Sequence, residues 1–353
     1  MLALRKTTPA FGAGLVEVDA PQPPGPGWLT VDVAAAGICG SDIHAYEWTT
    51  GYGFMAAFMP LTLGHEFAGT VRAVGADVTA FRAGDRVTCW PTLACGACSA
   101  CRAGRPHDCQ DRVVIGLHVD GAFAGQVAVP AANCRPIPDR LPLDVAALSE
   151  PLAVAVNAVD VAEVGEGDRV VVLGPGPIGL FIAWVALGRG ANVLLVGLDD
   201  AARLATAREI GIRATADLVN EPLAEAVRRS FGAEPDRVIE ATGAARSVAD
   251  GLEILRSGGV LVTAGIHSGS LDLDLTRFVR SKKQIRAAHD TTARALDTAI
   301  RLLAEHADIL AALITHRRPL DAAVDAFDLA RSRQAVKVLL HPQPATAEAG
   351  TRR

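Results

Sequence analysis

Four cysteines stand close together in this sequence, at Cys95, Cys98, Cys101 and Cys109, in a C-x2-C-x2-C-x7-C pattern. Four thiolates at this spacing can enclose one tetrahedral Zn²⁺, and in a ferredoxin-like context the same spacing holds an iron–sulfur cluster. Four protein ligands leave a zinc ion no open coordination position. We therefore predict a structural metal site, with zinc and iron–sulfur both open, and expect activity to come from other residues.

A second group of candidate ligands lies upstream of the cysteine run. Residues 37–44 read Gly-Ile-Cys-Gly-Ser-Asp-Ile-His, and residues 64–66 read Gly-His-Glu. A thiolate, an imidazole and a carboxylate are good zinc ligands, and three protein ligands with an open fourth position make a catalytic site. A lone cysteine is more often a small buried hydrophobe. The prediction therefore depends on these residues occurring together on glycine-flanked loops.

A glycine-rich turn further along the chain is typical of dinucleotide binding. The run 170–173, Val-Val-Val-Leu, leads directly into Gly-Pro-Gly-Pro-Ile-Gly, and an apolar helical stretch follows. In that context the first glycine permits the turn, the second lets the backbone approach a pyrophosphate, and the third allows helix–strand packing. The helix N-terminus offers free N–H groups to the phosphates. The predicted cofactor-binding residues of this turn are Gly174, Gly176, Pro177, Ile178 and Gly179.

The adenosine end of NAD needs an acid about 20 residues after the turn. The second strand of this region ends in Gly197-Leu198-Asp199-Asp200, so an acid is present, slightly later than usual. Asp199 would repel the 2′-phosphate of NADP, whereas Arg203 is near enough in sequence to help bind one. We therefore expect NAD, with NADP as the alternative. The ribose contact is Asp199, or Asp200 in its place, or neither.

Two kinds of secondary-structure pattern position these groups. Up to residue 150, short β-rich runs alternate with Gly/Pro turns, which indicates a partly open barrel of antiparallel strands. The character changes at Glu150-Pro151, and from Asp168 β-branched runs alternate with helical patterns, which predicts βαβ units and a parallel sheet. The predicted strands are 28–33, 69–74, 85–90, 170–173, 193–196, 237–240 and 260–263, the predicted helices are 201–210 and 297–305, and residues 342–353 are predicted to form a polar tail.

Composition excludes several classes of protein. The chain has 353 residues, a net charge of −5 and 5% aromatic residues, without the basic stripe that nucleic-acid binding requires. The apolar stretch 178–198 is broken by glycines and reads as a helix followed by a strand, so no membrane span is expected. The start of the chain lacks the apolar core of a secretory leader. Seven cysteines, four of them clustered, favour metal binding over disulfides, and a cytoplasmic location is expected.

Taken together, these motifs resemble those of the zinc-dependent medium-chain dehydrogenase/reductase family. The resemblance covers residues 20 to 340 and rests on three motifs in the family's order: 37–44 with 64–66, 95–109 and 174–179. Within the family the chain is most similar to the threonine and polyol (sorbitol-like) dehydrogenases. That similarity rests on two segments, His44-Ala45-Tyr46-Glu47-Trp48 and Glu150-Pro151-Leu152. The strand end at Gly197-Leu198 departs from the acid that many NAD-using members carry there.

The resemblance implies two zinc ions and a proton relay. Cys39 and His65 would be ligands of a catalytic zinc, with Glu66 as the third ligand and Glu150 as the alternative carboxylate. Ser41 resembles the family's relay hydroxyl and His44 the imidazole that passes the proton onward, while Asp42 reads as an orienting acid. The cysteine run would hold the structural zinc through Cys95, Cys98, Cys101 and Cys109.

The implied fold is α/β, with a Rossmann doubly wound parallel sheet and a GroES-like, mostly antiparallel β catalytic domain. The expected boundaries are 1–155 for the catalytic domain, 156–289 for the Rossmann domain, 290–341 for a return segment of the catalytic domain and 342–353 for the tail. The implied activity is hydride transfer between a secondary alcohol or polyol and NAD(P), in a dimer or tetramer. The alternatives are a threonine-type amino-alcohol dehydrogenase, a zinc-independent reductase and a non-enzymatic member of the superfamily.

The substrate is less well defined by the sequence. The stretch between the two ligand motifs is more apolar than a wholly hydrophilic sugar alcohol requires, and would suit a secondary alcohol, a cyclitol or a larger hydroxylated metabolite. Its side chains either line the substrate pocket or pack the loop. The residues in question are Trp48, Thr49, Tyr52, Phe54, Met55 and Phe58, with His289 and Asp290 as further candidate polar contacts.

Overall fold

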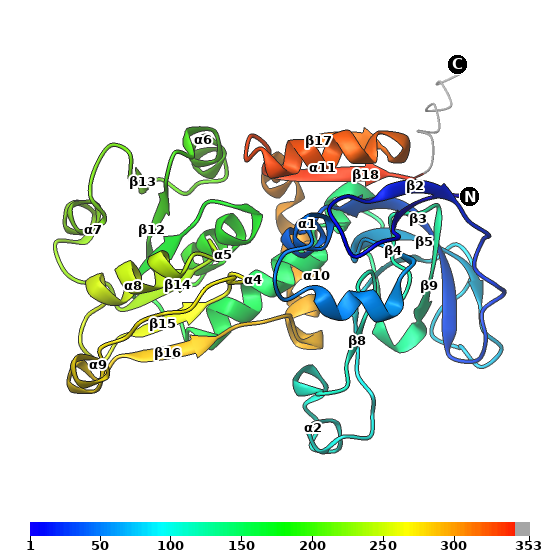
Figure 1. The fold of residues 1–353 in the computed structure, drawn as a ribbon, viewed down its shortest axis with the longest axis horizontal. Helices are drawn as coiled ribbons and strands as arrows, with labels where there is room; N and C mark the ends of the chain where they lie inside the picture. Colours follow the sequence, from blue (N-terminus) through cyan, green and yellow to red (C-terminus); the bar gives the residue numbers. More distant parts are fainter. Residues whose placement is uncertain (343–353) are drawn as a thin grey trace. The chain divides into compact units, whose positions relative to one another are not determined.

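The computed structural model describes residues 1–342, which form two compact units (Figure 1). The first unit comprises Met1–Glu150, Ile300–Ala307 and the chain from Ile314 onward, and the second comprises Pro151–Ala299 and Asp308–Leu313. The chain therefore leaves the first unit at residue 150 and returns to it near its end. The tail predicted over 342–353 lies outside the described residues, apart from Pro342.

The first unit is built on a mostly antiparallel sheet, as the sequence predicts. Its strand order is β10-β6-β5-β3-β18-β17, with β9 also paired to β3. Strand β18, from the end of the chain, pairs antiparallel with β3, so it completes the sheet that carries the candidate ligands. The strands are β3 (Trp28–Gly37), β5 (Glu66–Val74), β6 (Arg86–Cys89), β9 (Gln126–Pro130), β10 (Cys134–Pro136), β17 (Ile314–Pro319) and β18 (Lys337–His341), beside a second sheet of β1 (Leu2–Lys6), β2 (Gly14–Glu17) and β4 (Leu61–Thr62).

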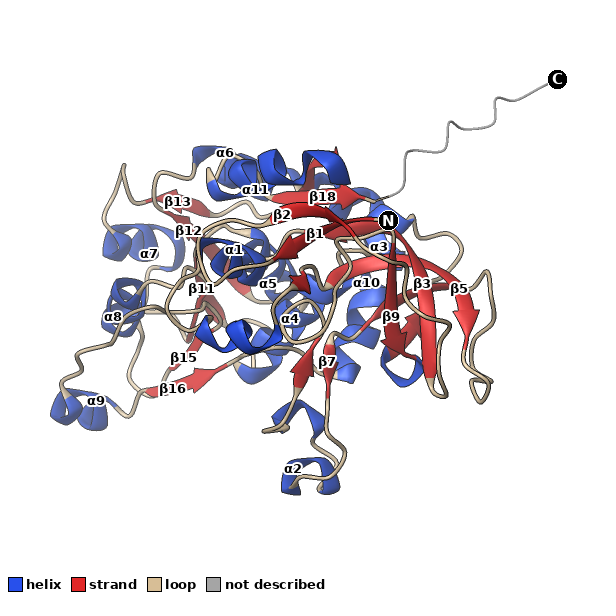
Figure 2. Ribbon diagram, turned by 45° about the vertical axis from the view of Figure 1, so that its right-hand side comes forward, coloured by secondary structure: helices blue, strands red, loops and turns tan. Residues whose placement is uncertain are grey.

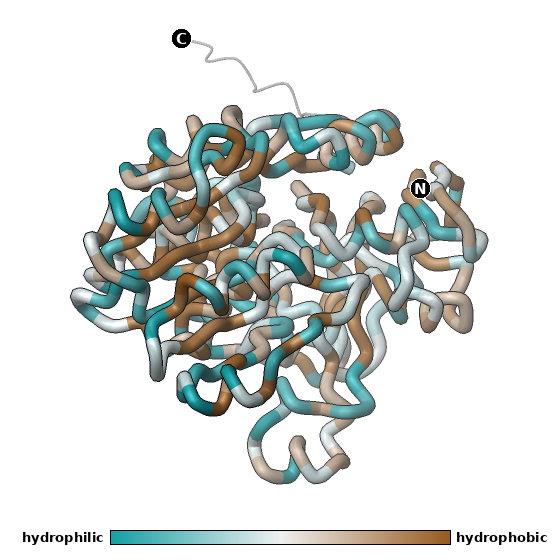
Figure 3. Tube along the Cα trace, turned by 60° about the vertical axis from the view of Figure 1, so that its left-hand side comes forward, coloured by the Kyte–Doolittle hydropathy of each residue, from teal (hydrophilic) through white to brown (hydrophobic). Residues whose placement is uncertain are grey.

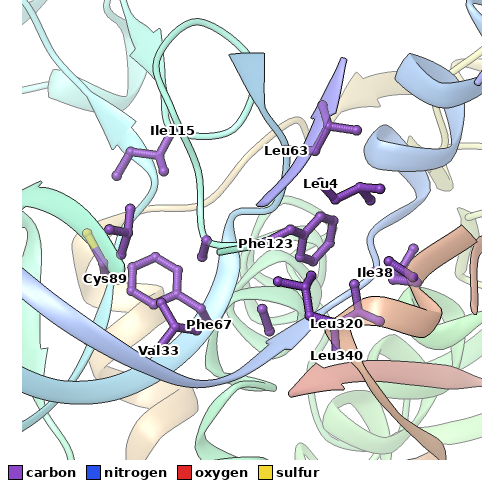
Figure 4. Packing of buried hydrophobic residues seen from close by; sticks show 14 of the residues in the cluster. Leu4, Val33, Ile38, Leu63, Phe67, Cys89, Ile115, Phe123, Leu320 and Leu340 are labelled. Carbon is purple, nitrogen blue, oxygen red and sulfur yellow. The ribbon is translucent and has the colours of Figure 1, made fainter. Parts of the chain in front are cut away.

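A continuous apolar core holds these strands together. Phe67, Phe123 and Leu340 come from distant parts of the chain and are almost completely buried in one cluster (Figure 4). Cys89 and Cys134 face each other across β6 and β10 and are 1% and 3% exposed, which agrees with the packing role predicted for them. Burial of this kind contributes about 25 cal/mol per Å² of apolar surface.

A small lobe extends from this unit. It begins at the two-stranded ribbon of β7 (Thr92–Leu93) and β8 (Val113–Val114) and carries α2 (Ser99–Arg102) at its far end (Figure 2). The four clustered cysteines lie within it. Each of its helices is no more than one turn long, so a metal bound by the four cysteines would stabilise the lobe.

The second unit is a parallel sheet of six strands in the order β13-β12-β11-β14-β15-β16. This is the doubly wound order of a dinucleotide-binding fold. The four strands predicted here are confirmed, whereas β13 and β16 were missed because they are short and lie at the sheet edges, where polar residues are tolerated. The bounds are β11 (Arg169–Leu173), β12 (Asn192–Gly197), β13 (Thr215–Asp217), β14 (Arg237–Glu240), β15 (Val260–Thr263) and β16 (Gln284–Ala287).

Helices accompany both sheets, and apolar runs alternate with hydrophilic segments along the trace (Figure 3). The helix predicted over 201–210 is observed as α6, while that predicted over 297–305 is the middle of the longer α10. The helices are α1 (Gly40–Glu47), α3 (Leu143–Ala146), α4 (Ser149–Val161), α5 (Pro177–Gly188), α6 (Ala201–Glu209), α7 (Leu223–Phe231), α8 (Ala245–Ile254), α9 (Leu275–Ser281), α10 (Ala293–Leu310) and α11 (Ala323–Arg331), with 3₁₀ turns η1 (Gly53–Phe58), η2 (Pro106–Asp108), η3 (Ala131–Asn133), η4 (Ala311–Leu313) and η5 (Leu320–Ala322). Within residues 1–342, no helix combines the length and apolar character needed to cross a bilayer.

Candidate active site and dinucleotide-binding turn

Cys39 is the N-cap of helix α1 and follows the last residue of strand β3, Gly37, by two positions. The carboxylate of Asp42, in the first turn, accepts the Cys39 N–H at 3.0 Å through Oδ2, a position where a helix favours negative charge. Its other oxygen accepts the Gly64 N–H at 3.3 Å. Burial raises the pKa of Asp42. This single buried carboxylate therefore ties the Cys39 turn to the loop that carries the second ligand motif.

His65 is placed between two side chains of α1. Its Nε2 lies 3.1 Å from Ser41 Oγ, and its Nδ1 lies 3.6 Å from Asp42 Oδ1. Burial opposes a charge on His65, but nearby carboxylates, with Asp42 the strongest, outweigh it and raise its pKa. A carboxylate facing one ring nitrogen and leaving the other for a ligand is the usual arrangement around a metal-binding histidine.

Glu66 forms a buried ion pair that the sequence did not reveal. Lys337 Nζ, from β18, lies 2.6 Å from Glu66 Oε2 and also donates to Ile38 O at 3.1 Å. The Lys337 and Glu66 side chains are 2% and 1% exposed. Position 37 must be glycine, since a Cβ there would collide with Glu66 Oε2. The one feature of the sequence that pointed to this ion pair was a lysine inside the apolar run 335–340.

The donor set of this site fits a catalytic zinc. Burial, with the negative charges of Glu66 and Glu150, raises the pKa of the Cys39 thiol, and a divalent cation would reverse this by stabilising the thiolate. The Glu66 Oε1 atom is buried without a hydrogen-bond partner in the described chain. Glu150 is 5% exposed at the start of α4. Thiolate, imidazole and carboxylate are the donor types that zinc takes.

The four clustered cysteines form a more compact group. Among residues 1–342, they are the one set of His, Cys and carboxylate ligand atoms that all lie within 4.8 Å of one another. Cys95 Sγ is 4.0 Å from Cys101 Sγ, and Cys98 Sγ is 3.9 Å from Cys109 Sγ. Tetrahedral zinc with Zn–S bonds of 2.3 Å requires sulfur separations of ~3.8 Å. The cluster therefore has the geometry for structural zinc.

His44 lies on the same helix as Ser41 but has different partners. Its Nδ1 is 3.0 Å from Thr49 Oγ1, and its ring stacks on Tyr52 with a centroid separation of 5.5 Å. Burial lowers the pKa of His44, which favours the neutral imidazole at neutral pH. A neutral imidazole can accept a proton.

The glycine-rich turn joins β11 to α5 in the second unit. Gly174 has a φ of +102°, and a Cβ there would lie 2.8 Å from Thr242 Cγ2, so only glycine fits. Gly179 packs against the Gly174 carbonyl, which excludes a side chain at that position too. A Cβ at Gly176 would meet no protein atom within 4 Å, so the space beside this backbone is open to an approaching ligand. Pro177 and Ile178 open the helix, with Gly176 as its N-cap.

The acids after β12 have distinct environments. Asp199 is exposed with a φ of +56°, and its N–H donates to Asp217 Oδ1 at 2.8 Å. Asp200 is 5% exposed, accepts the Leu198 N–H at 3.2 Å, and lies 3.8 Å from Arg203 Nη1. Asp199 thus presents the exposed charge, whereas Asp200 is committed to the turn and to Arg203. The contribution of Asp217 was missed, since it comes from the edge strand β13.

A second buried acid supports the glycine turn. Glu240 ends β14, is fully buried, and accepts the Thr242 and Gly243 N–H groups at 2.6 and 2.9 Å. His267 Nε2 lies 2.9 Å from its other oxygen. Because Thr242 packs against Gly174, Glu240 holds the loop that shapes the turn. The sequence predicted the strand but gave this carboxylate no role.

Asp290 was predicted, together with His289, as a candidate polar contact to the substrate. In the structure it stabilises the turn in which it lies. It has a φ of +64°, its carbonyl accepts from Asn157 at 3.1 Å, and its carboxylate accepts the Thr291 N–H at 2.6 Å. These contacts account for Asp290 without a substrate.

Comparison with known proteins matches each of the two parts of the chain to a known family of domains. The alcohol dehydrogenase GroES-like domain matches residues 25–139, and the glucose dehydrogenase C-terminus matches residues 143–341. The L-threonine 3-dehydrogenase of Pyrococcus abyssi (strain GE5 / Orsay) is 35% identical over 351 residues, which cover 96% of this chain and 98% of that protein. The sorbitol dehydrogenase of Halalkalibacterium halodurans is 34% identical, with 97% and 99% coverage.

A solved structure shows the same architecture. A protein of Sinorhizobium meliloti 1021, described as a zinc-binding dehydrogenase and bound to NADP, is 30% identical with a TM-score of 0.85, and the match covers 97% of this chain and 99% of that one. The predicted family and fold are thereby confirmed. The chain belongs to the zinc-dependent alcohol dehydrogenase family, whose members are NAD(P)-dependent oxidoreductases of alcohols and polyols.

Proposed function

We propose that this dehydrogenase transfers a hydride between a secondary alcohol or polyol and NAD(P), with its reaction centre at Cys39, His65 and Glu66. The observation that carries the proposal is the way Asp42 joins the Cys39 turn to the His65 loop inside one buried site. A zinc ion bound there would act as a Lewis acid and lower the pKa of a substrate hydroxyl. The nicotinamide supplies the hydride chemistry.

Glu66 is our choice for the third ligand, with Glu150 as the alternative. Lys337 holds only one oxygen of Glu66, Oε2, and leaves Oε1 buried without a hydrogen-bond partner. An orphaned buried carboxylate oxygen costs free energy unless a cation or donor satisfies it. Glu150 is close enough to raise the pKa of Cys39, so it remains available to the same centre.

Ser41 and His44 are proposed to move the substrate proton. Ser41 Oγ lies 3.1 Å from His65 Nε2, so its hydroxyl lies beside the nitrogen that faces away from Asp42. His44 is partly buried with a lowered pKa, which suits a group that accepts a proton and releases it again. The contact between His44 and Thr49 holds the imidazole in place.

Replacement of Cys39 tests the reaction centre. We expect metal analysis to find about two zinc ions per chain in the purified protein, one at each predicted site. Cys39→Ser should lose one zinc and all measurable turnover, followed as NAD(P)H absorbance with a secondary alcohol. Ser41→Ala should keep both ions and lose about 10²–10⁴-fold in kcat.

Cys134→Ser provides the matched control, since it removes a buried thiol outside both sites. It should retain both zinc ions and near-normal turnover. Full activity of a Cys39→Ser protein with one zinc would contradict the proposed centre.

We propose NAD as the preferred cofactor. Asp199 presents an exposed carboxylate at the end of β12, and Arg203 is paired with Asp200. The carboxylate would repel a 2′-phosphate, and the paired arginine is already partly neutralised. Asp199→Ser should therefore raise kcat/KM for NADP relative to NAD by about tenfold, a change of ~1.4 kcal/mol. Asp272→Ser removes another exposed acid of this unit and should leave the ratio of kcat/KM for NADP to that for NAD unchanged. A preference of the unmutated protein for NADP would refute the assignment.

A threonine-type activity is the second candidate function. The relative from Pyrococcus abyssi carries that name, and the chain matches it over 98% of its length. Initial rates with L-threonine, D-sorbitol and 2,3-butanediol separate the two candidates. We also propose a reducing, cytoplasmic setting, because clustered thiolates bind a metal only while they stay reduced.

The sheet of the second unit suggests a homo-oligomer, a dimer or tetramer. Strand β16 is at the sheet edge, with Ile285 38% exposed, and the neighbouring helix α9 exposes Leu275 and Val279 at 67% and 69%. An exposed edge strand with apolar neighbours is a ready site for pairing with another chain. The symmetric partner is then a second copy of this chain.

A further inference from the structure

Aromatic residues are concentrated next to the reaction centre. The chain has only sixteen Phe, Trp and Tyr residues, and five of them fall within residues 46–58. On the 3₁₀ turn η1, Met55 is fully buried, whereas Phe54 and Phe58 are each 42% exposed. Met55 therefore anchors the turn, and the two phenylalanine rings stay at the surface. Grouped apolar rings at a surface mark a binding site more often than a single exposed residue does.

These rings form a continuous ladder with two histidines. His44 stacks on Tyr52 at 5.5 Å, and Tyr52 lies 6.0 Å from Phe54, measured between ring centroids. His118 lies 4.8 Å from Phe54, nearly parallel at 24°, and 5.0 Å from Phe58. All four separations are in the range of favourable ring pairs. The ladder therefore runs from the relay histidine outward to the exposed rings.

The loop that supplies His118 is packed on the loop of the second ligand motif. A Cβ at Gly116 would lie 2.7 Å from Gly64 O, and Ala122 N–H donates to Gly64 O at 2.8 Å. Gly64 directly precedes His65. The position of His118 is therefore tied to the reaction centre through the backbone.

His118 adds a hydrogen-bond donor to the rings. The Val114 N–H donates to His118 Nδ1 at 3.2 Å, so the neutral imidazole carries its proton on Nε2. Burial lowers the pKa of His118, which favours this neutral form. At the other end of the ladder, burial, together with the charges of Cys39 and Asp42, raises the pKa of Tyr52 above its ordinary value, so its hydroxyl stays protonated.

We propose that Phe54, Phe58 and His118 form a subsite of the active site that binds a ring-borne secondary alcohol, a cyclitol or a pyranose. One flat C–H face of the ring stacks on the exposed phenylalanines, and His118 Nε2–H donates to a ring hydroxyl. A short open-chain amino alcohol has no such face and gains nothing from the ladder. This inference rests on the proposed dehydrogenase function and names the substrate class of that same site.

A matched pair of substrates tests the inference. myo-Inositol and D-sorbitol both carry six hydroxyls on six carbons, but only the first is a ring. With the zinc-loaded enzyme and saturating cofactor, we expect kcat/KM for myo-inositol to exceed that for D-sorbitol by about tenfold or more, as expected for one ring-stacking contact. Phe54→Leu keeps apolar volume without the ring and should erase most of this preference, whereas Phe54→Trp should retain it. His118→Phe should raise KM for myo-inositol and leave its kcat nearly unchanged.

Two controls separate the subsite from the reaction itself. 2,3-Butanediol has no ring to stack, so Phe54→Leu and His118→Phe should lower its kcat/KM less than they lower that for myo-inositol. Phe11→Leu removes an exposed ring that contacts Tyr46 outside the ladder, and should preserve the preference for myo-inositol. Oxidation of 2,3-butanediol without a preference for myo-inositol, or a preference unaffected by Phe54→Leu, would overturn the subsite and leave the dehydrogenase function standing. No oxidation of any alcohol would refute both.

Discussion

At the scale of single residues, two buried carboxylates organise the proposed reaction centre. Asp42 joins the Cys39 turn to the Gly64 loop, and Glu66 is held by Lys337. The types and spacing of Cys39, His65 and Glu66 were enough to predict a candidate metal site from the sequence. The partner of Glu66 was not predictable, because Lys337 lies 271 residues away and is brought to the site by strand pairing alone.

The pair of Lys337 and Glu66 makes a prediction about stability. Both side chains are buried, so Lys337→Met leaves a buried carboxylate without its cation. We expect this variant to lose about 3–5 kcal/mol of unfolding free energy, measured by urea titration of the purified protein. The double variant Lys337→Met/Glu66→Gln removes both charges and should recover a large part of that loss. If the single variant were as stable as the unmutated protein, the ion pair would have no structural role.

At the scale of elements, the alternation of β-branched runs with helical patterns along the chain predicted the central strands well. Strands β14 and β15 have the predicted bounds, 237–240 and 260–263, because buried parallel strands are continuous β-branched runs. The edge strands β13 and β16 were not predicted, because their alternating polar residues resemble the sequence of a loop. This matters for the site, since β13 supplies Asp217, which holds the Asp199 turn.

A charge cluster at the start of β11 and β14 is expected to make stability depend on pH. Asp236 accepts hydrogen bonds from Arg169 at 2.9 Å and from Arg256 at 2.6 Å. The hydrogen bond from Arg169 is the main cause that lowers the pKa of Asp236 below its ordinary value of 3.8. The unfolded chain then binds the proton more readily than the folded one, so this stabilisation is full above pH 3.8 and is lost as pH falls below it.

Asp236→Asn should therefore cost about 1.5–3 kcal/mol at pH 7, the usual contribution of a charged hydrogen bond. The difference from the unmutated protein should shrink as the pH is lowered from about 5 to 2, measured by urea unfolding at each pH. Asp250→Asn is the control, since it breaks an exposed i,i+4 pair with Arg246 that is worth about 0.3–0.5 kcal/mol. A difference that stays constant down to pH 2 would contradict the assignment.

At the scale of the whole molecule, the chain order builds the first unit from three separate stretches. Strand β18 returns to pair with β3 and brings Lys337, and η5 and α11 add Leu320 and Phe327 to its core. The sequence indicated a change of pattern at Glu150-Pro151. The return of the last segment was implied by family resemblance alone, since no local pattern shows which sheet a strand will join.

The edge strand makes a prediction about assembly. If β16 pairs with a second copy, a charge at Ile285 should disrupt the interface, because a lysine on an edge strand opposes pairing. We expect Ile285→Lys to reduce the assembly to a smaller species, measured by sedimentation equilibrium. Val16→Lys changes an exposed side chain of the first unit and should leave the mass unchanged. A monomeric unmutated protein would rule the proposal out.

The sequence by itself determined the features that depend on neighbours along the chain. The cysteine spacing, the glycine turn and the Cys39–His44 motif are local, so residue types and intervals predicted their chemistry. Tertiary structure alone decided which distant groups complete these motifs: Lys337 beside Glu66, and His118 against Phe54. The physical reason is that a buried charge or an exposed ring obtains its partner from strand pairing and core packing, which short-range sequence patterns do not encode.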